Sequence, residues 1–306
     1  MTAIAYLGPR GTFSEAALGG MAAAGLLPHG PDVDQLPTDS TPAALEAVRS
    51  GAADYACVPI ENSIDGSVIP TLDNLAAGTP LQVFAELTLD VAFSIVIRPG
   101  VAAADVRTVA AFPVAAAQVR RWLAENLPDA EVVPAISNAG AADDVSHGRA
   151  DAGVSTALAA HRYGLDTLAD GVVDEANART RFVLVGRPGP PPPRTGADRT
   201  SVVLKLDNEP GALVSALTEF GIRDIDLTRI ESRPTRVELG TYVFFLDCVG
   251  HIDDIAVAEA LKALHRRCAD VRYLGSWPTG AATGSVPPQL DDATQWLNRL
   301  RSGEQP

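Results

Sequence analysis

Residues 180–193 read TRFVLVGRPGPPPP and join an apolar run to a proline-rich stretch. The run from Phe182 to Val185 is bounded by glycine and prolines, so we expect a buried strand there. The prolines that follow have no N–H to donate and should form an extended, semi-rigid spacer between two domains. We therefore expect a first domain at 1–186, a linker at 187–199, a second domain at 200–278, and a flexible tail at 279–306.

In the first domain, short apolar runs typical of strands alternate with alanine-rich runs typical of helices. Such alternation indicates an α/β fold with mainly parallel strands. The long apolar stretch 87–97 lies near the middle and should carry the chain from one sheet to another. We expect two α/β lobes with a cleft between them, where such folds bind ligands, and a single sheet is the alternative.

The second domain shows the order βαββαβ, which is typical of a ferredoxin-like sheet with helices on one face. Its other face, or its edge, should remain free for a partner subunit. In the tail, five residues fall on one face of a helix, and we expect this face to pack on the protein itself. They are Leu290, Ala293, Trp296, Leu297 and Leu300.

The charge and composition indicate a soluble globular protein of 306 residues, with 46% hydrophobic residues and a net charge of −14. This charge argues against nonspecific binding of nucleic acid, which requires Lys and Arg to neutralise phosphates. The start of the chain lacks a basic region followed by a long apolar stretch, and no run of about 18 apolar residues occurs. We therefore expect a cytoplasmic protein without a nucleic-acid or membrane partner.

The cysteines and histidines predict neither disulfides nor a metal site. The three cysteines are odd in number and far apart, at Cys57, Cys248 and Cys268. The five histidines include no pair at the close helical spacing of metal ligands. We expect buried, reduced thiols and no bound metal.

A polar turn follows the first expected strand. Residues 8–15 read GPRGTFSE, and Thr12 and Glu15 have the spacing of a helix-capping box. A turn with glycines, the N–H groups of a helix start and Arg10 together suit a carboxylate ligand. The alternative is a capped helix with a surface arginine, and the pattern does not choose between the two.

Residues 58–67, VPIENSIDGS, repeat this design with a strand, a polar turn and a helix start at or near Ser67. Glu61, Asn62 and Ser63 come at the carboxyl end of the strand, where α/β proteins place ligand-binding groups. Glu61 would donate a proton if desolvation kept it protonated, or would orient a neighbour by hydrogen bonds. In the structural alternative, Asn62 and Ser63 only bond their own backbone.

Thr180 and Arg181 bring a hydroxyl and a guanidinium to the mouth of the buried strand. No histidine or lysine adjoins Thr180 to act as its base, so we do not expect a nucleophile. A positioned hydroxyl can still donate a hydrogen bond to a departing oxygen. Arg181 would hold a carboxylate or form a structural ion pair. Taken alone, the triplet favours a structural role.

Together, these three motifs resemble those of the prephenate dehydratase family in their order and separations, and the resemblance extends to about Trp277. It is carried by residues 8–14, 59–63 and 180–182. The family converts prephenate into phenylpyruvate in phenylalanine biosynthesis. The resemblance implies a carbon–oxygen lyase with a two-lobed fold like a type II periplasmic binding protein, an active site between the lobes and an essential threonine there.

Prephenate carries two carboxylates and a ring hydroxyl, and the aromatic product drives the reaction, so we expect no metal or redox cofactor. The expected catalytic residues are Thr180, Glu61 and Arg181. Thr180 contacts the leaving hydroxyl, with Glu61 as the alternative acid. Arg181 and Arg10 neutralise carboxylates, helped by the helix starts at Thr12 and Ser67. The expected substrate-binding residues are Arg10, Thr12, Ser14, Asn62, Ser63, Phe182 and Asn177.

The second domain adds an independent resemblance. Residues 211–213 (GAL) and 231–234 (ESRP) are similar to two motifs of the ACT regulatory domain in this family, where phenylalanine binds between subunits. A helix start near Gly211 suits the carboxylate of an amino acid, and Glu231 favours its ammonium group. The resemblance implies L-phenylalanine as effector of a homodimer or homotetramer, bound by Gly211, Ala212, Leu213, Glu231, Ser232, Arg233 and Pro234.

Two positions depart from the family pattern. Many members have Ser-His-Pro where this chain has Ala111-Phe112-Pro113, although Gln118 matches downstream. The family asparagine commonly lies two residues before the threonine, whereas Asn177 lies three before Thr180. Asn177 either does the same work through a shifted backbone or does none.

Two rival functions remain open at this point. Arogenate dehydratase acts on a substrate in which an ammonium-bearing carbon replaces the ketone, and the motifs do not discriminate between the two substrates. A non-catalytic amino-acid sensor could combine a two-lobed fold with an ACT domain, but it would give no reason for the motifs around Glu61 and Thr180 to coexist.

Overall fold

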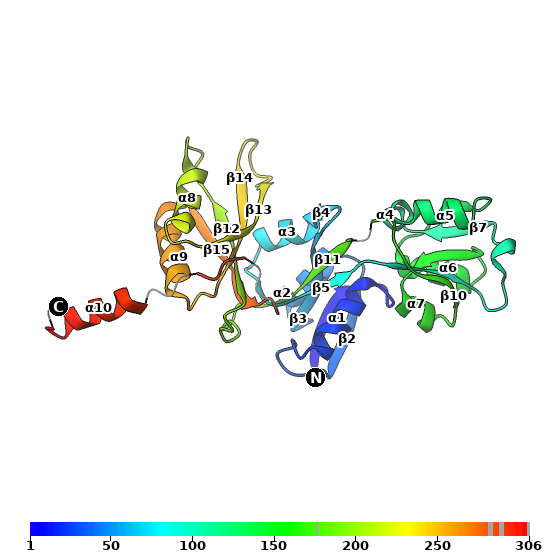
Figure 1. Cartoon of the computed structure of the whole chain (residues 1–306), viewed down its shortest axis with the longest axis horizontal. Helices are drawn as coiled ribbons and strands as arrows, with labels where there is room; N and C mark the ends of the chain where they lie inside the picture. The colour runs from blue at the N-terminus through cyan, green and yellow to red at the C-terminus, as the bar shows by residue number, and fades with distance from the viewer. Residues whose placement is uncertain (176, 281–283, 288–290, 305–306) are drawn as a thin grey trace. The chain divides into compact units, whose positions relative to one another are not determined.

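The structure, a computed structural model, describes residues 1–175, 177–280, 284–287 and 291–304 (Figure 1). The chain forms two compact units. The first comprises residues 1–72 and 87–185, and the second comprises residues 73–86 and 186–306. Residues 73–86 therefore belong with the C-terminal unit, although they lie within the first domain expected from the sequence.

The first sheet has the strand order β2-β1-β3-β11-β5, with β4 paired to β3. Strand β1 pairs in parallel with both β2 and β3, as expected of an α/β lobe. The strands are β1 (Thr2–Leu7), β2 (Val33–Thr38), β3 (Tyr55–Asn62), β4 (Gly66–Ser67), β5 (Gln82–Asp90) and β11 (Arg179–Gly186), and the helices are α1 (Phe13–Ala23), α2 (Thr41–Ser50) and α3 (Ile69–Ala76).

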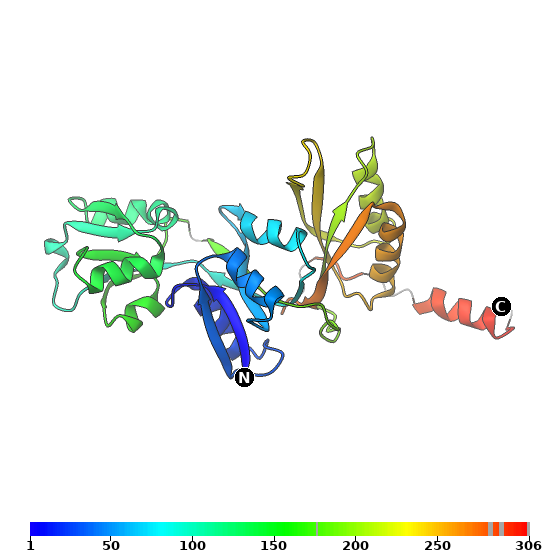
Figure 2. The same cartoon turned by 180° about the vertical axis from the view of Figure 1, so that it is seen from behind.

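The second sheet has the order β10-β6-β9-β7-β8. Alternate strand residues face opposite sides, so Val109 packs with helices α4 and α5, whereas Ala110 packs with α6 and α7 (Figures 1 and 2). The elements are β6 (Phe93–Ile97), η1 (Ala103–Asp105), β7 (Thr108–Ala111), α4 (Pro113–Gln118), α5 (Arg120–Asn126), β8 (Glu131–Pro134), α6 (Asn138–Ser146), β9 (Ala152–Ser155), α7 (Ala157–Arg162) and β10 (Asp166–Val172).

The long apolar stretch 87–97 does connect the two sheets, because it runs from β5 into β6. The helical segment that follows β7 is divided into two helices, α4 and α5. Val119 has non-helical backbone angles and separates α4 from α5. The carbonyl of Gln118 accepts a hydrogen bond of 2.6 Å from the N–H of Asp174, a long-range contact that the local pattern cannot show.

The C-terminal unit contains the expected βαββαβ order, and its sheet runs β13-β14-β12-β15. Helices α8 and α9 pack on one face through a core that includes Leu204, Phe220, Leu246 and Leu264. The elements are β12 (Asp198–Lys205), α8 (Ala212–Gly221), β13 (Leu227–Pro234), β14 (Tyr242–Val249), α9 (Ile255–Arg267) and β15 (Asp270–Pro278).

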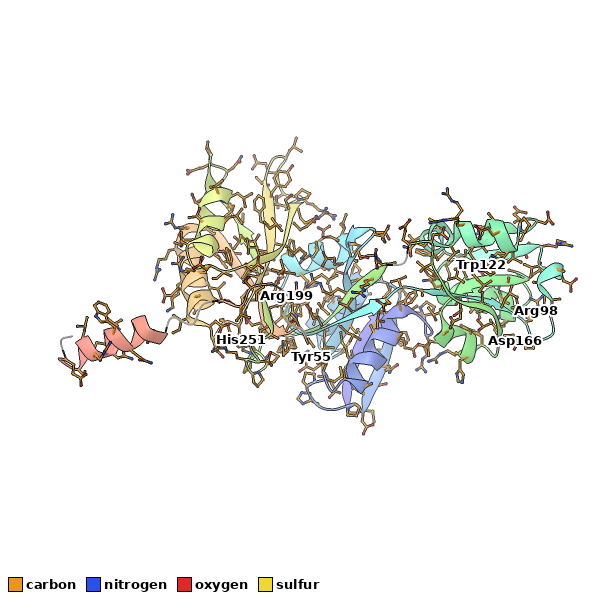
Figure 3. The ribbon with its side chains drawn as sticks, in the orientation of Figure 1. Tyr55, Arg98, Trp122, Asp166, Arg199 and His251 are labelled. Atoms are coloured by element: carbon orange, nitrogen blue, oxygen red, sulfur yellow. The ribbon has the colours of Figure 1, made fainter. Side chains whose placement is uncertain are left out.

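The other face of this sheet is not open along its whole length, because a buried ionic network covers part of it. Arg199 (labelled in Figure 3) lies 3.1 Å from the carboxylate of Glu86, and Arg229 lies 3.0 Å from that of Asp247. The indole N–H of Trp277 donates to Glu86 at 2.9 Å. Because these charges are buried, each depends on its partner to offset the loss of water.

In the tail, α10 (Asp291–Arg301) confirms the expected helix, but its apolar face does not pack on the described chain as predicted. Trp296 is 48% exposed, and Leu297 and Leu300 are exposed as well. Leu290 and the side chain of Ala293 lie outside the described residues. Over the ranges that the structure describes, no helix has the length and apolar character needed to span a membrane.

Candidate active site

Thr180 lies in β11 and is 9% exposed, and its Oγ1 accepts a hydrogen bond of 2.9 Å from Nδ2 of Asn62. The other end of the Asn62 amide, Oδ1, accepts from the N–H groups of Ile64 and Asp65 at 2.8 and 2.9 Å. These two bonds determine which end of the amide faces Thr180. A hydroxyl has one proton to donate, and Asn62 occupies one of its acceptor positions. The proton of Thr180 is therefore directed to a different acceptor.

Arg181 forms an ion pair with Glu61, from the neighbouring strand β3. Its Nε and Nη2 lie 3.1 and 2.9 Å from Oε2 of Glu61. Arg181 is 6% exposed, whereas the Glu61 side chain is 39% exposed. Of the two roles left open for Arg181, binding a substrate carboxylate or forming a structural ion pair, the structure favours the ion pair. A substrate carboxylate would compete with Glu61 for this guanidinium.

Ser63 forms hydrogen bonds to the backbone of residues 177–179, which lead into β11. Its Oγ donates to the carbonyl of Asn177 and accepts from the N–H of Arg179, both at 2.9 Å. Its own N–H donates to the carbonyl of Arg179 at 2.8 Å. Ser63 therefore acts on backbone groups, and Asn177 takes part through its carbonyl while its side chain is exposed.

The first polar turn is a capped helix start. Thr12 is the N-cap of α1, and its Oγ1 donates to the carbonyl of Leu7 at 2.9 Å and accepts from the N–H of Glu15. The carboxylate of Glu15 accepts from the N–H of Gly11. In a standard capping box, the Glu15 carboxylate would accept from the N–H of the N-cap residue Thr12, but here it accepts from the N–H of Gly11. Glu15 thus brings its own negative charge to this helix start, and Arg10 is exposed.

This turn is also tied to the second lobe. The carbonyl of Gly11 accepts a hydrogen bond of 2.6 Å from Thr156, and Glu15 pairs with Arg162 of α7. Gly11 has φ +91°, and a Cβ there would lie 3.0 Å from the Cβ of Ala159. Glycine is required for both reasons.

Tyr6, in β1, is buried and precedes this turn in the chain. Burial and the nearby carboxylate of Glu15 raise the pKa of Tyr6 to about 12, so its hydroxyl stays protonated at neutral pH.

The helix expected at or near Ser67 is present, but Ser67 itself lies in a strand. Gly66 has φ +79° and turns the chain back, so Gly66 and Ser67 form the short strand β4 opposite Asn62 and Glu61. The helix α3 begins two residues later, at Ile69. Ser67 therefore supports the strand that carries Glu61, and it offers no helix-end N–H groups to a carboxylate.

Two other expected substrate-binding residues, Ser14 and Phe182, are buried. Ser14 lies in the first turn of α1, and Phe182 follows Arg181 in β11. Neither lines the pocket described next.

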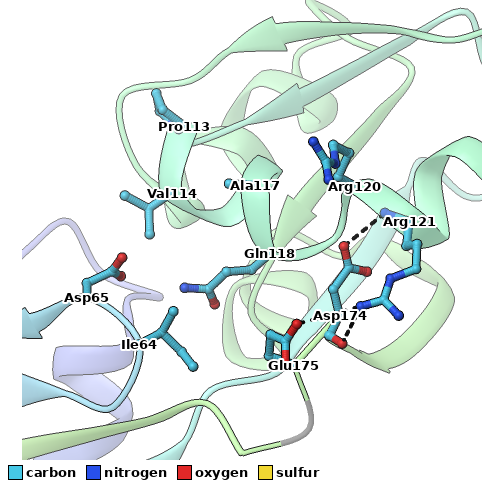
Figure 4. A pocket seen from close by; sticks show the side chains of 10 residues that line it. All are labelled: Ile64, Asp65, Pro113, Val114, Ala117, Gln118, Arg120, Arg121, Asp174 and Glu175. Carbon is cyan, nitrogen blue, oxygen red and sulfur yellow. Dashed lines mark hydrogen bonds and ion pairs between the residues drawn. The ribbon is translucent and has the colours of Figure 1, made fainter.

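A pocket of about 490 Å³ borders the turn that positions Asn62 (Figure 4). Gln118 and Arg120 line it, and neither is among the residues predicted from the motifs. Gln118 could have been found from the sequence, because it matches the family pattern downstream of Ala111-Phe112-Pro113. Nothing in the sequence pointed to Arg120. The lining residues are Ile64, Asp65, Pro113, Val114, Ala117, Gln118, Arg120, Arg121, Asp174 and Glu175.

In the C-terminal unit, the two predicted effector motifs differ in what they contact. Gly211 has φ +85° and caps the start of α8 without a side-chain hydrogen bond. Arg233, in the second motif, donates from Nε and Nη2 to the carboxylate of Asp73 at 3.1 and 3.3 Å. Arg236 also pairs with Asp73. Arg233 is thus held by a carboxylate of residues 73–86.

The cysteines are free thiols. Burial raises the pKa of Cys57 to about 12, and burial with the neighbouring Asp247 raises that of Cys248 to about 12. Within the described part of the chain, no three His, Cys, Asp or Glu side chains are grouped as metal ligands.

Comparisons with known proteins agree with this arrangement. A family model described as prephenate dehydratase matches residues 4–190, and one described as ACT domain matches residues 200–266. A curated prephenate dehydratase from Mycobacterium sp. (strain JLS) is 74% identical over 308 residues, which cover 99% of this chain and 97% of the relative.

Two solved structures are similar over most of the chain. Prephenate dehydratase from Arthrobacter aurescens, in complex with L-Phe, has a TM-score of 0.88 and 40% identity, covering 99% of this chain and 100% of the other. GqqA, described as a novel type of quorum quenching acylase, has a TM-score of 0.78 and 31% identity, covering 90% and 97%. A shared fold thus occurs with a different activity.

The family model spans more than half of the chain, and the 74% identical relative is matched over nearly its whole length. Both findings confirm the resemblance seen in the three motifs, and the ACT family model and the solved relative from Arthrobacter aurescens confirm the two-lobed α/β fold with an ACT domain. The chain belongs to the prephenate dehydratase family.

Proposed function

We propose that this chain is a prephenate dehydratase, a lyase that removes CO2 and the ring hydroxyl from prephenate to give phenylpyruvate. The identity to curated prephenate dehydratases supports the activity. The observation in the structure that supports the chemistry best is the hydrogen bond from Asn62 to Thr180, because it leaves the Thr180 proton for an acceptor other than Asn62.

The reaction breaks two bonds on opposite sides of the ring. The electrons of the bond to the departing carboxylate enter the ring, and the bond to the hydroxyl oxygen breaks as the ring becomes aromatic. Hydroxide is a poor leaving group, so a hydrogen bond that strengthens as negative charge develops on the oxygen accelerates this step. Thr180 supplies that hydrogen bond, and Asn62 holds its oxygen in place.

Glu61 and Arg181 support this site as a pair. Arg181 restrains the carboxylate of Glu61, which directly precedes Asn62 in β3. With Glu61 held by a guanidinium, Thr180 is the better candidate to assist the leaving hydroxyl, and Glu61 remains the alternative acid. Arg10 is the proposed exposed partner of a substrate carboxylate. The remaining proposed residues shape or anchor the site: Thr12, Ser14, Ser63, Asn177 and Phe182.

L-Phenylalanine is the proposed effector. The ACT family model matches residues 200–266, and the relative from Arthrobacter aurescens was solved with L-Phe. Residues 211–213 and 231–234 are the proposed binding motifs, in a homodimer or homotetramer. The effector regulates activity only if it binds two states of the protein unequally. We further propose a cytoplasmic enzyme with domain boundaries near 186 and 200.

The test is turnover of both candidate substrates by the purified chain. Release of phenylpyruvate from prephenate, with a higher kcat/KM than for arogenate, is the expected result. A higher kcat/KM for arogenate would make the chain an arogenate dehydratase. If neither substrate reacts while phenylalanine still raises the melting temperature, the non-catalytic sensor replaces the enzyme.

A further inference from the structure

Helix α3 (Ile69–Ala76, labelled in Figure 1) is divided between the two compact units, because the first unit includes Leu72 and the second begins at Asp73. Boundaries between compact units usually fall in exposed, flexible linkers that few contacts cross. A helix is stiff instead, because hydrogen bonds join each turn to the next. A displacement at one end of α3 is therefore passed to the other end, and the contacts at the two ends decide what it connects.

The N-terminal end of α3 is hydrogen-bonded to β3, within the first unit. Thr71 is fully buried, and its Oγ1 donates to the carbonyl of Pro59 at 2.5 Å. Just before the helix, the N–H of Val68 donates to the carbonyl of Ile60 at 2.9 Å. Pro59 and Ile60 directly precede Glu61 in β3. A shift of α3 therefore moves the backbone that leads into the candidate active site.

The C-terminal end of α3 is held by β15, within the second unit. Nη1 of Arg272 donates to the carbonyls of Leu75 and Ala77, both at 3.1 Å. Its Nη2 donates to the carbonyl of Gly78 at 3.2 Å. The last carbonyls of a helix have no partners within it and carry partial negative charge, so a guanidinium is favourable there. Arg272 lies outside both effector motifs and outside the candidate active site.

Between these two ends, Asp73 contacts the second effector motif. Its carboxylate lies 3.1 Å from Nε of Arg233, and each of the two side chains is only 15% exposed. Because both charges are largely removed from water, each depends on the other, and opening the ion pair is costly. The proposed phenylalanine site is therefore joined to the same helix that bonds to β3.

We propose that α3 transmits the binding of phenylalanine to the active site, with Thr71 and Arg272 as the residues that hold its two ends. This inference rests on the proposed function and names the element through which its regulation acts. The closed ion pair of Arg233 with Asp73 orients residues 231–234, so phenylalanine binds most tightly to the state in which this pair is closed. Binding then holds α3, and through Thr71 the strand β3, in the less active state. Such a difference in affinity between two states is what an effector requires.

The experiment measures a coupling factor, the ratio of kcat/KM for prephenate without phenylalanine to kcat/KM at saturating phenylalanine. The full-length wild type should give a factor of about 5 to 150, the usual range of allosteric coupling. Arg272→Met keeps an unbranched side chain but removes the three hydrogen bonds to the end of α3. It should leave kcat without phenylalanine unchanged and lower the factor at least about threefold. Calorimetry should show that phenylalanine still binds this variant.

The other end of the helix is tested independently by Thr71→Val, which removes the hydroxyl and nearly keeps the shape of the side chain. This variant should also lower the coupling factor, and Thr71→Ser, which keeps the hydroxyl, should restore it. The factor compares each variant with itself, so a change in basal kcat/KM does not alter it. If Thr71 served only to stabilise the fold, Thr71→Val would lower the melting temperature and leave the factor unchanged.

The matched control is Arg266→Met, which makes the same substitution at an exposed position of α9 and should keep the wild-type factor. Melting temperatures identify a variant that does not fold, and the other variant then decides alone. The inference is overturned if folded Arg272→Met or folded Thr71→Val keeps the wild-type factor. It is also overturned if Arg272→Met no longer binds phenylalanine, because Arg272 would then belong to the effector site. A wild type that does not convert prephenate, or that phenylalanine does not inhibit, would instead refute the proposed function.

Discussion

Replacing Thr180 by valine should abolish most of the turnover without unfolding the protein. Valine has nearly the shape of threonine and suits a buried strand, so the change removes the hydroxyl and little else. Asn62 then loses its acceptor for Nδ2, which costs about 1–3 kcal/mol of folding stability. The variant should melt a few degrees lower but remain folded.

The expected loss of kcat follows from the direction of that hydrogen bond. Because Asn62 donates to Thr180, the threonine proton is directed at the leaving hydroxyl in our mechanism. Removing one preorganised donor to a developing oxyanion typically costs a factor of about 10² to 10³ in kcat, or about 3–4 kcal/mol. We expect Thr180→Val to fall in this range and KM to change little, because the contact strengthens in the transition state.

The assay is the formation of phenylpyruvate from prephenate, with circular dichroism to confirm folding. Thr180→Ser is the control, since it keeps the hydroxyl and should retain kcat within about tenfold. A folded Thr180→Val that keeps near-wild-type kcat would refute the assignment of Thr180, and Glu61 would become the candidate acid.

Three ion pairs and one buried thiol give four further predictions. Arg181→Ala should raise KM for prephenate, because it releases the carboxylate of Glu61 from its ion pair. Unchanged kinetics would show that Arg181 and Glu61 do not take part in the active site. Asp73→Asn weakens the ion pair with Arg233 of the effector motif. The kcat without phenylalanine should be unchanged, and the phenylalanine concentration for half-inhibition should rise several-fold. An unchanged inhibition curve would contradict this prediction. Glu86→Ala removes the nearer of the two carboxylates beside the buried guanidinium of Arg199, and urea unfolding should show a loss of about 3–5 kcal/mol, whereas a loss below about 1 kcal/mol would mean that Asp247 compensates. Because burial raises the pKa of Cys57 to about 12, iodoacetamide should label this thiol at neutral pH only after denaturation, and labelling of the native protein would show that it is accessible.

Local features of this fold could be predicted from the sequence because they depend on neighbouring residues. The N-cap at Thr12 and the helix 255–267 follow from side chains within one turn of the helix start or from the 3.6-residue period. The missed features depend on distant partners. Ser67 is in a strand because it pairs with Glu61, and α4 ends where the carbonyl of Gln118 accepts a hydrogen bond from the N–H of Asp174.

The sequence by itself determined the alternating α/β pattern, the βαββαβ domain and the three motifs. The tertiary structure alone decided what the motif residues do to one another. Asn62 and Thr180 are 118 positions apart, and Glu61 and Arg181 are 120 apart, so only the adjacency of β3 and β11 brings them together. The direction of a hydrogen bond and the partner of a charge depend on that spatial contact, and no local pattern encodes either.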